Sequence, residues 1–451
     1  MMQSLAPRVS PRVSPALALL LLAGCASYTP RPLATTPPGA DIAALSRDAA
    51  TIDRPYLKPT NIDLAAPLDD NAIAVIAVLG NPDLKAMRVK TGVTDAQVFA
   101  ARLLPDPTFN LGLGSILSGP DPFSEIVSGL GLDLNTLRTG KVRRQQAEAQ
   151  ARQVRLDLAW AEWQTAAQAR LQAVRIRRLQ AAIDLLRIDD AAAKSLLGRN
   201  LRAAARGDVA SIGVQAARTD AAATADKLRT AERDADVARL ELVKLLGLPP
   251  ETPLRLAPAL DGDPALDPAR LTQIALDNRA DLQALREGYN AEEAAVHKAI
   301  LDQFPTLALN LNFTRDTGGN KILGPTVDFT LPLWNRNRGG IAIERATREQ
   351  LKAEYDARLF QTRADIAAAA SAVTLARTQR AAIRAQLPEL DRLARVSRAA
   401  ADRGDVSRAT AEAAEGALRT KRVELATADQ TIDETMIALE LLTGVPREDW
   451  K

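Results

Sequence analysis

Residues able to perform covalent or metal chemistry are scarce in this sequence. Its 451 residues include one cysteine and one histidine. A disulfide needs two cysteines, and a structural zinc site or a Cys–His nucleophilic pair needs more such residues than the chain supplies. The sole histidine, His297, stands in an Ala/Glu-rich helical stretch and is expected to be exposed. Because no Gly-rich phosphate loop or nucleophile elbow is present, we predict no enzyme activity, no cofactor and no metal site.

Adjacent acidic residues are the remaining candidates for acid–base chemistry. Asp189 and Asp190 form one such pair, and Glu292 and Glu293 form another. Both pairs lie within helical charge patterns, which favours a solvated helix face. The formal charge of +3 falls to +1 when the two arginines of residues 1–24 are removed. A chain so close to neutral gives no electrostatic reason to expect nucleic acid as a partner.

The cysteine stands where a lipid could be attached. Arg8 and Arg12 precede an apolar run at residues 16–23, which is typical of a signal peptide and too short for a membrane span. Residues 22–25 (Leu-Ala-Gly-Cys) resemble the bacterial lipoprotein box, in which the cysteine is acylated and becomes the new N-terminus. We therefore predict a lipoprotein signal peptide over residues 1–24 and lipidation of Cys25. An ordinary cleaved signal with a chance cysteine is the alternative.

The remainder of the chain is duplicated at a spacing of about 197 residues. Arg-Gly-Asp-Val occurs at residues 206–209 and again at 403–406, and Leu-Leu-Gly-Leu-Pro at 245–249 matches Leu-Leu-Thr-Gly-Val-Pro at 441–446. The predicted organisation is an N-terminal anchor and extended segment (25–66), a first repeat (67–250), a Pro- and Asp-rich linker (251–268), a second repeat (269–446) and a C-terminal tail (447–451).

Two candidate strands occur in each repeat. Residues 109–114 and 126–134, and then 307–314 and 327–333, largely alternate between apolar and polar or glycine residues. Short segments with one apolar face are typical of outer-membrane barrels, and a soluble hairpin packed on a core is the alternative. Aromatic residues near the strand ends are candidates for interfacial girdles. They are Phe109, Phe123, Phe313, Phe329 and Trp334.

A long helix follows each strand pair, over about residues 140–206 and 340–403, where glycine and proline are rare. In the second helix, positions from Tyr355 to Ala394 recur at steps of four and three, which predicts a coiled-coil seam. Pro388 is expected to kink or break this helix.

Each long helix should end in a tight turn. Gly207 and Gly404 are placed to adopt positive φ after the helix, and Asp208 and Asp405 are placed to N-cap the returning helix. The predicted result is a pair of antiparallel helix hairpins.

Four strands cannot close into a barrel, so open edges would leave backbone groups unpaired in lipid. Three chains would supply twelve strands. The predicted fold is therefore mainly α with a small transmembrane β part, duplicated within the chain. Its trimer would form a 12-stranded β-barrel continued by an α-helical barrel.

The sequence resembles the TolC family of outer membrane factors over nearly the whole mature chain. The resemblance is carried by the duplicated element order, by residues 103–107 (Leu-Leu-Pro-Asp-Pro) before the first strand, and by residues 327–341. Residues 332–339 (Pro-Leu-Trp-Asn-Arg-Asn-Arg-Gly) look closest to the branch that serves heavy-metal efflux pumps.

The resemblance implies a homotrimeric channel in the outer membrane of a Gram-negative bacterium, lipid-anchored, with a long periplasmic extension. It would be the exit duct of a tripartite efflux pump and would work with a periplasmic adaptor (membrane fusion protein) and an inner-membrane pump. By position, the family's adaptor-docking tips fall on Arg206, Gly207, Asp208, Val209, Arg403, Gly404, Asp405 and Val406. The family's aperture acids are not matched one for one, but Glu412 and Glu415 stand beside the corresponding positions. The alternative is a lipid-anchored periplasmic coiled-coil scaffold or adaptor, and the cargo, metal cations or drugs, stays open.

Overall fold

The computed structural model describes residues 28–35, 42–258 and 264–450, and the chain divides into two compact units, residues 1–39 and 40–451. Residues 28–35 of the first unit form neither helix nor strand. The signal peptide proposed for residues 1–24 and the lipidation site Cys25 lie outside the described residues, so both stay predictions.

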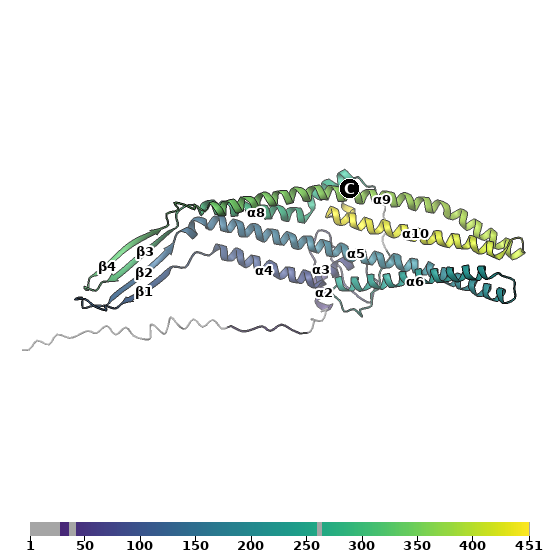
Figure 1. The fold of residues 1–451 in the computed structure, drawn as a ribbon, viewed down its shortest axis with the longest axis horizontal. Coiled ribbons are helices and arrows are strands. Elements are labelled where there is room, and N and C mark those ends of the chain that lie inside the picture. Colours follow the sequence, from purple (N-terminus) through teal and green to yellow (C-terminus); the bar gives the residue numbers. More distant parts are fainter. Residues whose placement is uncertain (1–27, 36–41, 259–263, 451) are drawn as a thin grey trace, which may run out of the picture. The chain divides into compact units, whose positions relative to one another are not determined.

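The second unit consists of two sets of elements in the same order (Figure 1). The first set comprises α3 (Asp70–Gly80), α4 (Pro82–Arg102), β1 (Thr108–Gly114), β2 (Glu125–Asp133), α5 (Asn135–Ala205) and α6 (Ser211–Leu245). The second comprises α7 (Pro268–Asn278), α8 (Ala280–Leu301), β3 (Leu307–Arg315), β4 (Lys321–Phe329), α9 (Arg338–Arg403) and α10 (Arg408–Thr443). Helix α2 (Ile42–Ala50) precedes the first set, and the short 3-10 helix η1 (Arg447–Asp449) follows the second.

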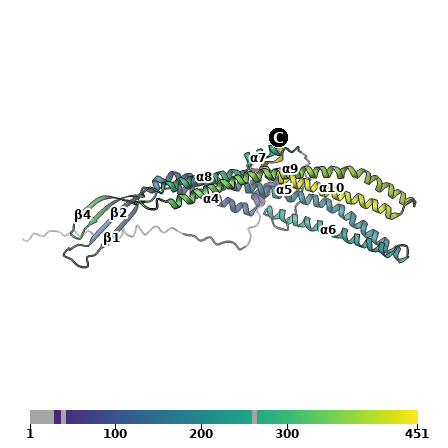
Figure 2. The same cartoon turned by 45° about the horizontal axis from the view of Figure 1, so that its top comes forward.

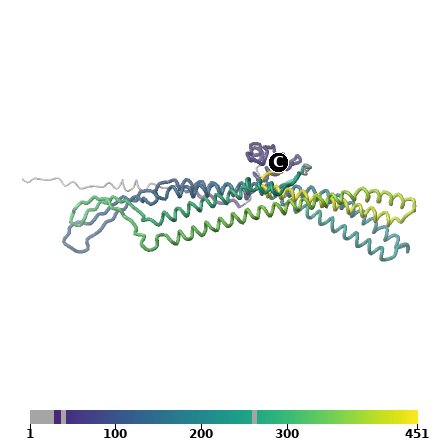
Figure 3. The backbone as a smooth tube through the Cα atoms, turned by 90° about the horizontal axis from the view of Figure 1, so that it is seen from above, coloured from purple at the N-terminus to yellow at the C-terminus, as the bar shows by residue number. Residues whose placement is uncertain are grey.

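The strands form one antiparallel sheet in the order β1-β2-β3-β4. Nearest the sheet, α5 packs on α4 and α8, and α8 packs on α9, so the helices repeat the order of the strands to which they connect. Farther along, α5 packs on α6 and α10, and α10 packs on α9 (Figures 2 and 3). With 71 residues, α5 is about 105 Å long, which separates the sheet from the hairpin turns. None of the described helices is long and apolar enough to cross a membrane.

The predicted seam of α9 is confirmed. Thr362, Ile366, Val373, Ala376 and Ile383 are all buried, and they are separated by four, seven, three and seven residues, as a seam with steps of four and three requires. Many of the buried positions in the long helices are alanine, which lets neighbouring helices approach closely. The helix continues through Pro388, so of the predicted kink or break the break is wrong.

The fourth strand differs from its prediction. The sequence pattern placed it at residues 327–333, whereas β4 spans Lys321–Phe329. The reason is the short turn after β3, because Lys321 already pairs with Arg315 and Phe329 pairs with Leu307, the first residue of β3. The apolar residues at 331 and 333 therefore lie beyond the end of the partner strand.

The duplicated sequence landmarks meet in space. In the first half, Asn81 caps α4 and its Nδ2 donates to the backbone oxygen of Leu245 at 3.2 Å. In the second half, Arg279 occupies the matching position and its Nη1 donates to the backbone oxygen of Leu442 at 3.3 Å. Gly247 has a φ of +66°, and a Cβ there would lie 2.2 Å from the Gly80 oxygen, so only glycine fits this close approach.

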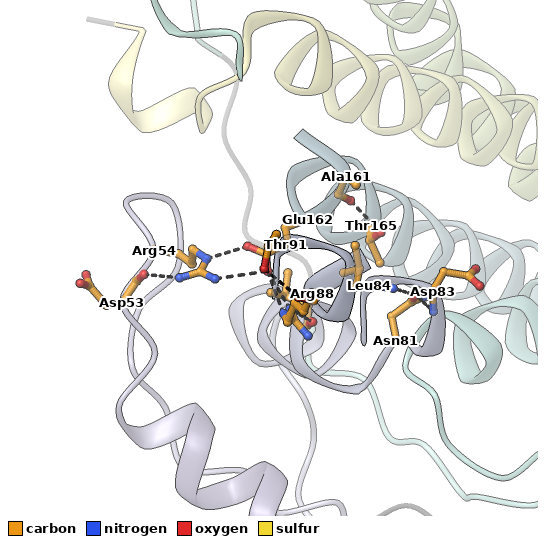
Figure 4. A network of polar contacts seen from close by, with 11 residues as sticks. Asp53, Arg54, Asn81, Asp83, Leu84, Arg88, Thr91, Ala161, Glu162 and Thr165 are labelled. Carbon is orange, nitrogen blue, oxygen red and sulfur yellow. Dashed lines mark hydrogen bonds and ion pairs between the residues drawn. The ribbon is translucent and has the colours of Figure 1, made fainter. Parts of the chain in front are cut away.

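The largest apolar core surrounds α3, whose residues from 73 to 78 are at most 1% exposed. A buried charge lies beside this core (Figure 4). Glu162 of α5 is 1% exposed and accepts from Arg54 Nε at 2.6 Å and from Arg88 Nη2 at 2.7 Å. Next to it, Tyr56 packs edge-on against Trp163, with ring centroids 4.9 Å apart. These contacts attach the segment after α2 to the middle of α5.

Candidate functional site: the exposed sheet and the two hairpin turns

The sheet presents an exposed apolar face. The strand register places alternate residues of all four strands on this face. We call it the apolar face, and its members are Phe109, Leu111, Leu113, Ile126, Ser128, Leu130, Leu132, Leu307, Leu309, Leu311, Phe313, Arg315, Lys321, Leu323, Pro325, Val327 and Phe329. Leu113 is 75% exposed, Phe109 69% and Leu323 68%. So large a contiguous apolar surface marks contact with lipid or with another protein.

The opposite face is polar and is organised around two glycines of β2. Asn310 Nδ2 donates to Asp328 Oδ2 at 2.6 Å, and Asn312 Nδ2 donates to Thr326 Oγ1 at 2.7 Å. A Cβ at Gly129 would lie 2.4 Å from the Asn312 Oδ1, and one at Gly131 would lie 2.3 Å from the Asn310 Oδ1. The glycines therefore leave the space that the polar side chains of β3 occupy. This arrangement was not recognised in the sequence, where Gly129 and Gly131 appeared only as the polar half of an alternation.

The five predicted girdle aromatics separate between the two ends of the sheet. Phe109 and Phe329 lie at the end where β1 begins and β4 finishes, next to the helices, and Trp334 follows in the connection to α9. Phe313 and Phe123 lie toward the opposite end, near the strand turns. Trp334 is 85% exposed and Phe313 37% exposed.

The two Arg-Gly-Asp-Val turns have the same backbone structure. Gly207 and Gly404 have φ values of +81° and +84°, which confirms the expected left-handed residues. The N–H of Gly207 donates to the Ala204 oxygen at 3.0 Å and the N–H of Asp208 to the Ala203 oxygen at 2.9 Å, the pattern of a Schellman motif. The second turn repeats both bonds around Gly404.

The predicted N-capping role of Asp208 and Asp405 is wrong. Their backbones still belong to the preceding turn, and both returning helices begin three residues later, after Ala210 and Ser407. The freed carboxylates instead bind the arginines of their own motifs, Arg206 Nε at 2.8 Å and Arg403 Nε at 2.9 Å.

Ion pairs near these turns join the two helix hairpins of one chain. Glu412 of α10 pairs with Arg199 of α5, and Arg419 of α10 pairs with Asp189 of α5 at 2.8 Å. Glu415 accepts from Arg398 Nη1 of α9 at 3.0 Å. Both candidate aperture acids are therefore neutralised by arginines within the chain, and the hairpins are linked to each other.

Three of the four paired acids do not lie on a solvated helix face, whereas Glu293 is exposed. Asp189 binds Arg419, and Asp190, which is 7% exposed, binds Lys194 Nζ at 2.6 Å. Glu292 faces Glu344 of α9. The pKa of Glu292 is raised to about 7, mainly by burial and secondly by this neighbouring carboxyl. The solvated-face interpretation is wrong for Asp189, Asp190 and Glu292 because each faces a neighbouring side chain, which for Asp189 and Glu292 lies on another helix.

This carboxyl pair predicts a pH-dependent stability. An acid whose pKa rises on folding, here from 4.5 to about 7, binds protons more tightly in the folded state. Stability is therefore lost as pH rises between these two values. We expect Glu292→Gln to raise the unfolding free energy at pH values above 7 by up to about 1 kcal/mol, allowing for solvent screening, and to have little effect below 4.5. Denaturant titration at both pH values checks this, with the exposed Glu354→Gln as control; an equal gain at both would contradict it.

Among the described residues, no group of three or more histidine, cysteine or acidic side chains is arranged to hold a metal ion. His297 is exposed, as expected.

Comparison with known proteins finds outer membrane proteins, which agrees with the exposed apolar face of the sheet. Residues 271–445 match the family model described as "Outer membrane efflux protein". The resemblance to the TolC family is thereby confirmed. A search of curated proteins finds no match.

Solved structures share the fold over most of the chain. The outer-membrane channel OprN is 17% identical, with a TM-score of 0.70 over 94% of this chain and 99% of that one. VceC from Vibrio cholerae is 15% identical, with a TM-score of 0.69 over 83% and 96%. The open state of MtrE from Neisseria gonorrhoeae is 17% identical, with a TM-score of 0.65 over 88% and 96%. The fold is that of outer membrane channels.

Proposed function

Given the family match of its second half, we propose that this chain is the outer membrane exit duct of a tripartite efflux pump. It conducts cargo passively from a periplasmic adaptor and an inner-membrane pump to the exterior. The observation that carries the proposal is the exposed apolar face of a four-stranded sheet that continues directly into helices about 100 Å long.

The edges of the sheet support a trimer. In the described part of the chain, β1 and β4 each have a neighbour on one side only. In a membrane the free edge of each strand needs a partner, and pairing β4 of one chain with β1 of the next closes a barrel. Three chains give twelve strands, with the polar face lining the lumen, the apolar face in lipid, and the girdle aromatics at the two interfaces. The test is ion conduction by the purified protein in a planar bilayer; a protein that forms no pore would contradict the proposal.

The hairpin turns at residues 206–209 and 403–406 are the proposed adaptor-docking tips. Their exposed Arg–Asp pairs are held by rigid Schellman turns, which presents charge and backbone in a fixed geometry.

Loss of the gene is expected to sensitise cells to certain metals or amphiphilic drugs, and unchanged tolerance to both would leave transport unsupported.

The inter-hairpin ion pairs predict a resting constriction. If Glu412 holds the two hairpins together and Glu415 holds α10 against α9, Glu412→Gln combined with Glu415→Gln should raise single-channel conductance several-fold. The matched control is Glu424→Gln, whose partner Lys421 lies on the same helix, so no inter-helix contact is lost. Unchanged conductance of the double variant would remove these acids from the gate.

A lipid on Cys25 would add an anchor to the barrel without replacing it. We expect Cys25→Ala to abolish acylation, measured as a mass shift, and to leave the protein in the membrane after alkaline extraction, because the sheet itself spans the bilayer. Release of the variant into the soluble fraction would instead favour the lipid-anchored scaffold.

A further inference from the structure

The apolar face ends at the strand turns with two cations. Arg315 is the last residue of β3 and Lys321 the first of β4, and the two are direct cross-strand partners. Both lie on the same face as Phe313 and Leu323, one row farther from the helices. Like charges directly opposite each other destabilise a sheet unless an anion lies between them.

In the described part of the chain, no carboxylate forms an ion pair with either cation. Asp316 accepts from the backbone N–H and the Nδ2 of Asn320, at 2.8 and 2.7 Å, and Asp121 accepts from Thr317 at 2.6 Å. Glu125 lies on the polar face, opposite Gly114. Within residues 28–35, 42–258 and 264–450, neither Arg315 nor Lys321 forms an ion pair.

An aromatic ring fixes the arginine at this edge. The guanidinium carbon of Arg315 lies 4.6 Å from the ring centroid of Phe123, which belongs to the β1–β2 connection. The N–H of Phe123 donates to the Thr317 oxygen at 3.2 Å, so this connection is held against the β3–β4 turn. The guanidinium is therefore attracted to this ring, which favours one position of the arginine side chain.

The position of the two cations matches the boundary between acyl chains and headgroups. From Leu307 to Arg315 the strand covers about 27 Å, comparable with the apolar band of a membrane barrel, which is about 25 Å tall. Leu113, level with the cations, and Leu323, one row closer to the helices, offer exposed surface to acyl chains.

We propose that Arg315 and Lys321, with Phe123 behind the guanidinium, bind the phosphate group of an anionic lipid in the outer leaflet, whose acyl chains lie along the apolar face. The proposal rests on the sheet spanning the outer membrane as described above. A lipid is favoured over free phosphate because the charged pair is continuous with exposed leucines, which inorganic phosphate would not use.

The experiment titrates the purified full-length protein, in phosphatidylcholine nanodiscs, with fluorescent lipid A that carries two phosphate groups. Arg315→Gln combined with Lys321→Gln should weaken binding about thirtyfold, since each basic residue near an anionic lipid contributes roughly a factor of five. The control removes two exposed arginines of α9, Arg345→Gln and Arg363→Gln, and should bind like the unmodified protein. Arg315→Lys should retain most of the affinity.

Equal affinity of the unmodified protein and the Arg315/Lys321 double variant would overturn the proposal. Displacement of the lipid by millimolar inorganic phosphate would also overturn it, because the site would then recognise a free anion. Single-channel conductance of the double variant should be unchanged, which shows that it folds. If the unmodified protein forms no pore, the proposed channel function is wrong. If it conducts ions but binds lipid A no better than phosphatidylcholine, only the proposed lipid site is wrong.

Discussion

Leu311→Arg should largely prevent the protein from accumulating in the membrane as a folded oligomer. Leu311 lies in the middle of β3 on the apolar face, paired with Leu130 and Pro325, and it is 49% exposed. An arginine at the midplane of a membrane barrel costs about 2–4 kcal/mol, and a trimer would bear that cost three times. Urea titration of the protein folded into lipid vesicles measures the loss directly.

The matched control is Thr314→Arg, three residues away on the opposite face. Thr314 pairs with Val127 and Ile322, and under the proposed orientation its side chain faces water in the lumen. We expect this variant to fold and to change conductance only. Equal damage from both substitutions would mean that the two faces do not differ in their surroundings, which contradicts a spanning sheet.

Glu162→Leu should destabilise the helical part by about 3 kcal/mol. This value is the lower end of the range for breaking a buried ion pair, because both arginine side chains are partly exposed to water. The carboxylate is shared by Arg54 and Arg88, so its removal leaves two cations without their carboxylate partner beside an apolar core. The segment after α2 should then detach from α5. Denaturant unfolding gives the free energy, and limited proteolysis near Arg54 reports the detachment.

Glu148→Leu is the control on the same helix. Glu148 pairs with Arg102 at 2.9 Å, but both side chains are well exposed, 38% and 59%, so we expect a loss below about 1 kcal/mol. A loss of similar size in both variants would show that the burial of Glu162 does not determine its contribution.

Much of the architecture could be predicted from residue patterns. The long helices, the duplication and the two-faced strands depend on local periodicity, and α9 buries the residues that its sequence spacing selects. The turns after α5 and α9 required glycine because their φ values are positive. These features depend on residues that are close together in the sequence, so they can be predicted without knowledge of the fold.

Features that depend on distant partners were missed or misassigned. Glu162 stands in an apolar stretch between Ala161 and Trp163, which is a signal of a buried charge, but its partners lie 74 and 108 residues away. Asp189 was assigned to a solvated face because its partner Arg419 is 230 residues away. In the sequence, Gly129 and Gly131 are only part of an alternating pattern. In the fold, asparagines of the neighbouring strand occupy the space that a side chain at either position would need.

The sequence by itself therefore determined the long helices, the presence of two strands in each repeat and which strand face is apolar, since period and backbone preference are local properties. Only the tertiary structure decided the register of β4, the release of Asp208 and Asp405 from capping, and the placing of Arg315 opposite Lys321. Each of these depends on where a partner strand ends or where a turn closes. Such geometry arises from contacts between elements, which no periodicity within one segment encodes.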